Sequence, residues 1–196
     1  MNRARNHGWI ASALLLIAGI AGCAAPGRLF VNREADMAYY KKVAVLPFAN
    51  LTNDRFAGER VTRMFVTELT IADRFQVADP GEIRSVLERT GGLPTYEGTY
   101  DPKKLKDAAV EVGANGLIRG AVSEYQMVGT NVSPRPSVAF DVEMVDVATG
   151  NVVWKASISK RGKARFPIVG GGAATLSRLT EDACRDVVRR IDHEAF

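Results

Sequence analysis

The segment Ser137–Ser159, SVAFDVEMVDVATGNVVWKASIS, restricts the fold more than any other part of the chain. Apolar residues take every second position over 138–144 and again over 152–158, which is the spacing of half-buried strands. A short Gly-bearing turn at 148–151 joins the two runs and predicts a β-hairpin. The alternation changes phase at 145–147, which is typical of a β-bulge. The fold therefore contains a sheet with at least one buried face.

Strand and helix patterns follow one another along the rest of the chain. The pairs Asp79-Pro80 and Asp101-Pro102 are typical of helix starts, because Asp accepts from free N–H groups and Pro suits the first helical position. The order β-α-β-α-α-β-β-β-α predicts one α/β (α+β) domain with a mixed β-sheet and packed helices. The predicted strands are 43–48, 75–78, 116–128 and the two arms of the hairpin, and the predicted helices are about 56–72, 80–90, 102–112 and 173–195.

The N-terminal segment has the pattern of an export signal. Arg3 and Arg5 precede the apolar run Trp9–Ala21, and no acidic residue comes before Glu34. The run is shorter than the roughly 20 residues that a membrane-spanning helix needs, but it fits the apolar region of a signal peptide. We therefore predict that residues 1–22 are a signal peptide.

The residues Ile20-Ala21-Gly22-Cys23 resemble the lipobox of bacterial lipoproteins, in which two small residues precede an obligatory Cys. Small side chains fit a peptidase groove, and the thiol takes a diacylglyceryl group. We predict lipidation of Cys23, a tether over 23–40 and one periplasmic domain over 41–196. An ordinary signal peptide with a coincidental Cys is the alternative.

The charge of the mature chain excludes one class of function. The whole chain has 26 basic and 22 acidic residues, and removing residues 1–22 takes away only Arg3 and Arg5. A nearly neutral domain gives no electrostatic case for nucleic-acid binding. With Cys23 acylated, Cys184 has no partner for a disulfide, so a buried side chain in a helix is favoured over an activated thiol.

Few residues of the mature chain have the chemistry of catalysis. His193 is its only histidine, so neither a histidine triad nor a His-based zinc motif can form. Asp141 and Glu143 share one strand face, which favours a solvent-facing row, with a glycosidase-type carboxylate pair as the alternative. We expect no catalytic residue, no metal site and no cofactor, and hence no enzyme.

Two further patterns have both an ordinary and a functional interpretation. Gly170–Gly172 precede a helix, but no P-loop Lys-Ser/Thr follows, so a flexible connection is favoured over an anion site. Lys160, Arg161, Lys163 and Arg165 form a basic run. A solvated loop is favoured there, and contact with lipid headgroups or an acidic partner is the alternative.

Three segments together resemble the CsgG/HfaB group of periplasmic lipoproteins: KVAVLPFANLTND at 42–54, GANGLIRGAVSEY at 113–125 and VAFDVEMVDVATGNVVW at 138–154. The resemblance extends over about 42–191. The domain of this group is similar to that of LpoB, which activates a peptidoglycan synthase, and to the N-terminal domain of TolB. The resemblance implies a CsgG-like fold, and it leaves a secretion channel, an accessory factor and a regulator as alternatives.

The lengths of the loops decide among these alternatives. A CsgG-type channel inserts two hairpins per subunit, and each hairpin needs roughly 20 or more residues to cross a membrane. The corresponding gaps at 128–137 and 161–172 are too short, so a pore is not expected. An LpoB-like activator reaches its synthase through a long linker, whereas a tether over 24–40 spans only about 20–25 Å as a flexible coil.

We therefore expect a non-enzymatic, lipid-anchored accessory or assembly factor in cell-envelope biogenesis or secretion, with an LpoB-like activator as the alternative. Ala24 follows Cys23, whereas an Asp there favours the inner membrane in enteric bacteria, so we expect the outer membrane, facing the periplasm. The expected partners are the membrane, through the anchor, and envelope proteins of secretion or cell-wall machinery. A homo-oligomer is compatible with the sequence, and nucleic acid is not expected.

Overall fold

The computed structural model describes residues 27–94, 99–130, 134–162 and 175–196. The predicted signal peptide, Cys23, Lys163, Arg165 and Gly170–Gly172 lie outside the described residues. The strands are β1 (Arg28–Val31), β2 (Lys42–Val45), β3 (Ala49–Asn50), β4 (Gln76–Val77), β5 (Gly116–Val128), β6 (Arg135–Asp146) and β7 (Val152–Arg161). The helices are the 3₁₀ turn η1 (Met37–Tyr39), α2 (Ala57–Ala72), α3 (Pro80–Arg89), α4 (Pro102–Glu111) and α5 (Leu176–Ala195).

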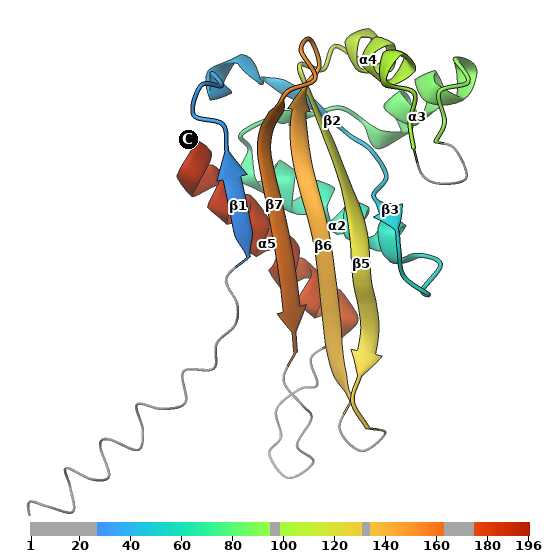
Figure 1. The fold of residues 1–196 in the computed structure, drawn as a ribbon, viewed down its shortest axis with the longest axis vertical. Helices are drawn as coiled ribbons and strands as arrows, with labels where there is room; N and C mark the ends of the chain where they lie inside the picture. The colour runs from blue at the N-terminus through green and yellow to red at the C-terminus, as the bar shows by residue number, and fades with distance from the viewer. Residues whose placement is uncertain (1–26, 95–98, 131–133, 163–174) are drawn as a thin grey trace, which may run out of the picture.

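The described strands form one mixed sheet in the order β1-β7-β6-β5-β2-β4, and β3 pairs with β5 beside β2 (Figure 1). β5, β6 and β7 are long and antiparallel, whereas β2 runs parallel to both β4 and β5. The predicted mixed sheet and the hairpin over 137–159 are confirmed. The pairing of β6 with β7 shifts between Met144 and Val145, which confirms the predicted bulge.

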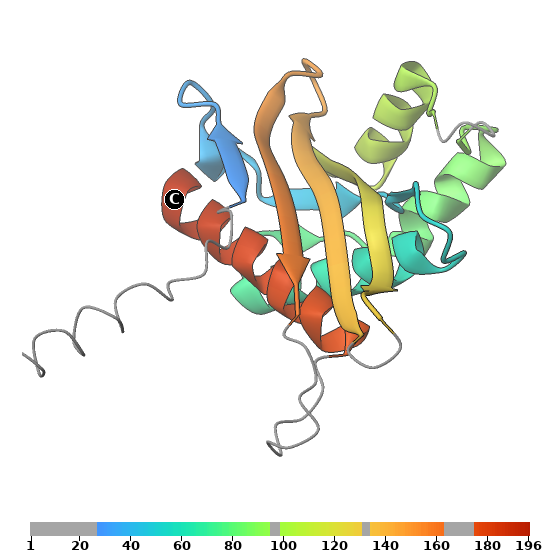
Figure 2. The same ribbon diagram turned by 60° about the horizontal axis from the view of Figure 1, so that its bottom comes forward.

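Helices pack on both faces of the sheet, but they cover the two faces unequally. α2 and α5 lie together against one face, behind β5, β6 and β7 in Figure 1, and enclose a core that includes Phe65, Phe140 and Trp154. α3 and α4 pack over the β2 end of the opposite face, around Leu46 and Leu117. The polar face of β6 and β7 is left uncovered by described helices (Figure 2).

Local sequence explains where the helices begin. Asp79 and Asp101 each accept hydrogen bonds from two backbone N–H groups of the first helical turn, as predicted. α5 begins at Leu176, and the Thr175 side chain accepts from the N–H of Arg178. Cys184, on the inner face of α5, is fully buried, and burial raises the pKa of its thiol. The prediction of a buried Cys184 is confirmed.

The domain begins earlier than predicted. β1 lies within the expected tether over 23–40, yet it pairs antiparallel with β7, and Leu29 and Val31 pack against the core. Tyr40 is buried as well, and its hydroxyl donates to Asp146 Oδ2 at 3.1 Å. Residues 28–40 are therefore part of the folded domain. A four-residue strand gives little periodic signal, and its partner strand is more than a hundred positions away in the sequence.

Asp146 joins the N-terminal residues 28–40 to the turn of the β6–β7 hairpin by hydrogen bonds. Its Oδ1 accepts from the backbone N–H and the hydroxyl of Thr149, at 2.6 and 2.8 Å, and its Oδ2 accepts from Tyr40. Burial acts to raise the pKa of Asp146, but these hydrogen bonds outweigh burial and lower it. Burial and the bond to Asp146 raise the pKa of Tyr40 to about 12.

We expect the Asp146→Asn variant to lose less stability in acid than the wild type. The pKa of Asp146 is lower in the folded than in the unfolded chain, so its ionised form favours folding above the ordinary value of about 3.9. That contribution disappears as the pH falls through the folded pKa. Urea unfolding at a series of pH values between about 7 and 3 measures the difference. Parallel wild-type and variant profiles would contradict this role of Asp146.

Candidate functional site

The open face of the sheet holds a groove with a volume of about 780 Å³, between β5, β6 and α4. Phe48, Tyr100 and Leu105 line its apolar part. Glu143 lies on its polar side, between Arg119 Nη2 at 2.7 Å and Lys155 Nζ at 3.0 Å.

The Glu143 carboxylate is held in its ionised form. Its side chain is only 15% exposed, so burial acts to raise its pKa, but the hydrogen bonds and charges of Lys155 and Arg119 outweigh burial and lower it. A general acid of a glycosidase needs a raised pKa instead. Asp141 is exposed, as predicted, and accepts from the Ser157 hydroxyl. The expected solvent-facing row is therefore confirmed for Asp141 but not for Glu143, whose side chain lies mostly buried between Arg119 and Lys155.

The described residues contain no group of His, Cys, Asp and Glu side chains arranged to hold a metal ion. None of the described helices has the length and apolar character to cross a membrane. In the predicted basic run, Lys160 pairs with Asp186 at 2.6 Å, while Arg161 is exposed.

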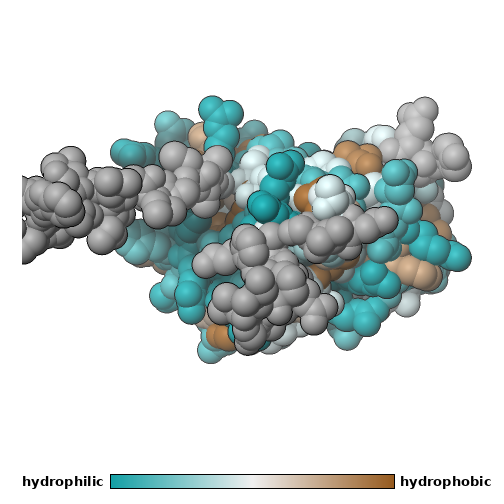
Figure 3. Space-filling model, turned by 90° about the horizontal axis from the view of Figure 1, so that it is seen from below, coloured by the Kyte–Doolittle hydropathy of each residue, from teal (hydrophilic) through white to brown (hydrophobic). Residues whose placement is uncertain are grey.

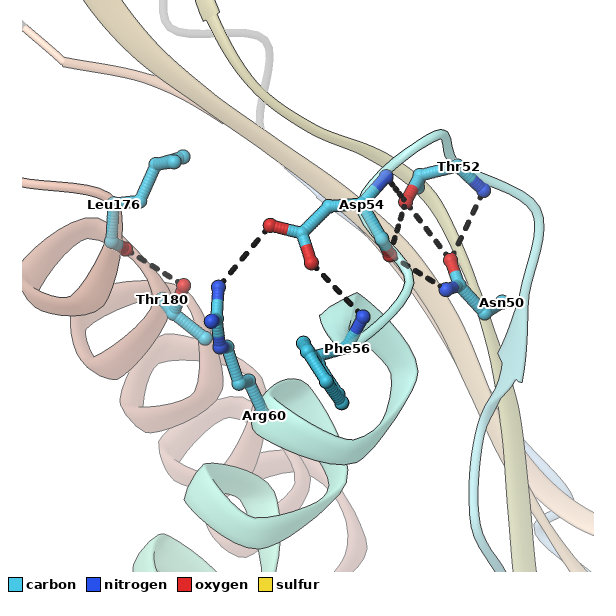
Figure 4. A network of polar contacts seen from close by, with 7 residues as sticks. All are labelled: Asn50, Thr52, Asp54, Phe56, Arg60, Leu176 and Thr180. Atoms are coloured by element: carbon cyan, nitrogen blue, oxygen red, sulfur yellow. Dashed lines mark hydrogen bonds and ion pairs between the residues drawn. The ribbon is translucent and has the colours of Figure 1, made fainter.

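A second surface is built by the loop that joins β3 to α2, residues 50–56, here called the 50–56 loop. Its polar side chains bond to its own backbone (Figure 4). Asn50 Oδ1 accepts from the N–H and hydroxyl of Thr52, and Asn50 Nδ2 donates to the Asp54 carbonyl at 2.7 Å. Asp54 Oδ1 accepts from the N–H of Phe56 at 2.9 Å, just before α2, whose first turn has no side-chain cap. These bonds give the loop a fixed shape without tertiary burial.

The 50–56 loop exposes apolar side chains. Leu51 is 69% exposed and Phe56 is 44% exposed. Arg55 lies over the Phe56 ring at 4.8 Å, and Arg60 lies near the rings of Phe56 and Tyr125, at 5.7 and 5.9 Å. Arg60 also pairs with Asp54 at 3.1 Å, whereas no carboxylate of the described residues pairs with Arg55. The loop thus offers apolar groups and one unpaired cation.

Beside this loop, β5 has an open edge. β3 pairs with β5 at Ala121 and Val122, and the N–H of Leu51 donates to the Val122 carbonyl at 2.9 Å. The 50–56 loop then turns away from the sheet. Beyond Val122, no strand in the described ranges pairs with this side of β5. Residues 123–128 form the β5 edge.

The backbone direction along the β5 edge follows from the pairing with β6. Met127 lies opposite Pro136, whose carbonyl accepts from Gly162 on the β7 side. In an antiparallel pair, the N–H and C=O of one residue point to the same side. The N–H and C=O of Met127 therefore point away from β6, and those of Tyr125 do so by alternation. The Met127 side chain is 48% exposed.

The molecular surface viewed from below is mostly hydrophilic, with small apolar patches (Figure 3). Sequence analysis did not identify Leu51 or Phe56 as surface residues. An isolated apolar residue in a loop has no periodic signal. Knowing that both are exposed requires knowing where the loop leaves the sheet.

Solved structures share this fold. The PelC dodecamer from Paraburkholderia phytofirmans is 21% identical, with a TM-score of 0.57, over 83% of this chain and 94% of that chain. The lipoprotein GNA1162 from Neisseria meningitidis is 16% identical, with a TM-score of 0.56, over 79% of this chain and 99% of that chain. At these identities the likeness extends to the fold alone. No curated protein matches the chain by sequence.

A family model does match by sequence. It describes the peptidoglycan-synthase activator LpoB and covers residues 29–158, about two thirds of the chain. The match runs from β1 nearly to the end of β7 and so includes the open sheet face, the 50–56 loop and the β5 edge. These comparisons do not support the resemblance to the CsgG/HfaB group. They do support the relation to the LpoB domain, which sequence analysis named as similar to the domain of that group. The chain belongs to the family of the peptidoglycan-synthase activator LpoB.

Proposed function

We propose that the protein is a non-enzymatic, lipid-anchored periplasmic factor that binds a peptidoglycan synthase and increases its activity. The family match over residues 29–158 carries this proposal. It favours the regulator that sequence analysis kept as the alternative over the CsgG-like assembly or secretion factor that it preferred. A pore stays disfavoured, because β5 and β6 pair out to Val128 and Arg135 and leave only a short connection between them.

The described surface supports a binding role. Glu143 is ionised and neutralised by Arg119 and Lys155, so it has no proton to donate and its negative charge is already balanced. By contrast, the exposed apolar residues of the 50–56 loop are a feature that protein partners use.

The residue at which the fold begins determines how far the domain can lie from its lipid anchor. With lipid on Cys23, only residues 24–27 separate the anchor from β1. At about 3.3–3.6 Å per extended residue, that link spans roughly 15 Å. The earlier estimate for a seventeen-residue tether is thus too long. The domain stays close to the outer membrane, and a synthase must bring its docking segment to that region.

The test is a glycan-polymerisation assay with lipid II and each purified peptidoglycan synthase of the source organism. Adding the mature protein is expected to raise the rate several-fold for at least one synthase, with direct binding to that synthase. Heat-unfolded protein serves as the control for detergent and crowding effects. Unchanged rates with every synthase would overturn the proposed function.

A further inference from the structure

The β5 edge offers a partner a row of unpaired backbone groups. Tyr125 and Met127 direct their N–H and C=O groups outward, beyond the point where β3 stops. An extended peptide can add to such an edge as a strand, because the backbone hydrogen bonds supply affinity and the flanking side chains supply specificity. The six residues of the edge match the usual length of a strand, about five or six residues.

The surroundings of the edge indicate which segment fits. Leu51, Phe56 and Met127 provide exposed apolar contacts. Arg55, which stacks on Phe56, is the cation of this surface that has no carboxylate among the described residues. A complementary segment therefore carries apolar side chains at alternate positions and a carboxylate that reaches Arg55.

The 50–56 loop is already ordered for such binding. Asn50, Thr52 and Asp54 hold its backbone by internal hydrogen bonds, and Asp54 also holds Arg60. Ordering a mobile loop costs binding free energy, so a preformed loop keeps that cost low. The same internal bonds make the chain leave the sheet after Leu51, and this departure is what leaves the β5 edge open.

We propose that the β5 edge and the 50–56 loop are the docking surface for an extended, apolar and acidic segment of the partner synthase, which joins the sheet as a strand beside β5. This inference rests on the proposed function. A two-fold contact with a second copy of the chain fits less well, because it brings the same patch against itself. The Asp54 carboxylate is already paired with Arg60, and Glu124 lies on the opposite sheet face from Tyr125, so the patch offers no free carboxylate to Arg55 of a second copy.

Three substitutions test the surface. Leu51→Lys puts a charge at the apolar contact, Arg55→Glu reverses the unpaired cation, and Met127→Pro removes an outward N–H that β6 does not use. Each is expected to weaken binding of the stimulated synthase at least tenfold and to reduce stimulation accordingly. The matched control is Ile71→Lys, since Ile71 is 70% exposed, like Leu51 at 69%, but lies at the far end of α2. The control is expected to bind like the wild type.

Hydrogen exchange distinguishes strand addition from simple apolar contact. Peptides that cover residues 123–128 are expected to become protected when the synthase is added to the wild type. Circular dichroism establishes that each variant is folded. If Met127→Pro unfolds, Leu51→Lys and Arg55→Glu still decide the outcome.

The possible failures are distinguishable. A wild type that neither binds nor stimulates any synthase overturns the proposed function itself. A wild type that stimulates, with all three variants equally active, overturns the docking surface alone. Analytical ultracentrifugation that shows a wild-type dimer dissociated by Leu51→Lys assigns the edge to a second copy and also overturns the docking surface.

Discussion

Replacing Cys23 with alanine is expected to abolish incorporation of labelled fatty acid and to leave the protein either unprocessed, with its signal peptide attached, or soluble. The thiol of Cys23 is the atom to which a diacylglyceryl group is attached in a lipobox, and alanine has no nucleophile to replace it. Buried acyl chains contribute about 0.8 kcal/mol per CH₂, and two or more chains hold a protein stably on a membrane. Metabolic labelling followed by fractionation measures both effects.

The second cysteine of the chain provides the matched control. Cys184 is buried between α5 and α2, with its Sγ 4.0 Å from the Val61 carbonyl. Its thiol is inaccessible and its pKa is raised by burial, so it cannot take the acyl group in place of Cys23. Cys184→Ala is expected to keep full labelling. Labelling that survives in Cys23→Ala would contradict the lipobox interpretation.

The effect of the Cys23→Ala substitution on function follows from the position of β1, which begins after the predicted anchor. Released Cys23→Ala protein remains folded, because β1 begins at Arg28 and does not depend on the acyl group. It is therefore expected to stimulate a purified synthase in solution as the wild type does. In the cell we expect it to lose its concentration at the membrane, so the proposed anchoring and the proposed activation are expected to be separable.

Much of the fold could be predicted because its elements carry local signals. The hairpin over 137–159 alternates over 138–144 and 152–158, and the Asp-Pro pairs at 79–80 and 101–102 mark helix starts that the structure contains. β1 and β3 were not predicted, since four and two residues carry no periodicity. Both strands exist because long strands far away in the sequence offer them pairing partners, a property that no local window contains.

The candidate site was harder to predict for the same reason. The β5 edge is open because β3 ends early, so its exposure depends on the neighbours of β5 and not on the residues of β5. The strand 116–128 itself was predicted correctly. Similarly, Phe56 stands at the start of a helical pattern, and only the folded position of the 50–56 loop shows that its ring is exposed.

The sequence resemblance identified the fold better than the family. The three quoted segments correspond to β2 with the 50–56 loop, to β5, and to the β6–β7 hairpin, which together form the centre of the sheet. These residues are constrained by packing and by turn geometry, so a resemblance confined to them indicates a fold more than a family. The family assignment rests on a match over residues 29–158.

Replacing Trp154 with alanine is expected to lower the free energy of unfolding by about 3–5 kcal/mol. Trp154 has no exposed surface, lies opposite Met144 of β6, and pairs with Val31 of β1 on its other side. Truncation therefore leaves a cavity where β1, β6 and β7 meet the α5 face. A domain of this size has a total stability of about 5–15 kcal/mol, so the loss is a large fraction of it.

The Trp154→Phe variant tests whether packing is the cause of that loss. The indole Nε1 of Trp154 has no hydrogen-bond partner among the residues described, so removing its N–H breaks no bond. Phenylalanine keeps most of the ring contacts, and we expect a loss well below that of alanine. Urea unfolding of both variants should be followed by circular dichroism, because Trp154 is the only tryptophan outside the predicted signal peptide. Equal losses in the two variants would show that the ring volume does not hold β1 and the hairpin together.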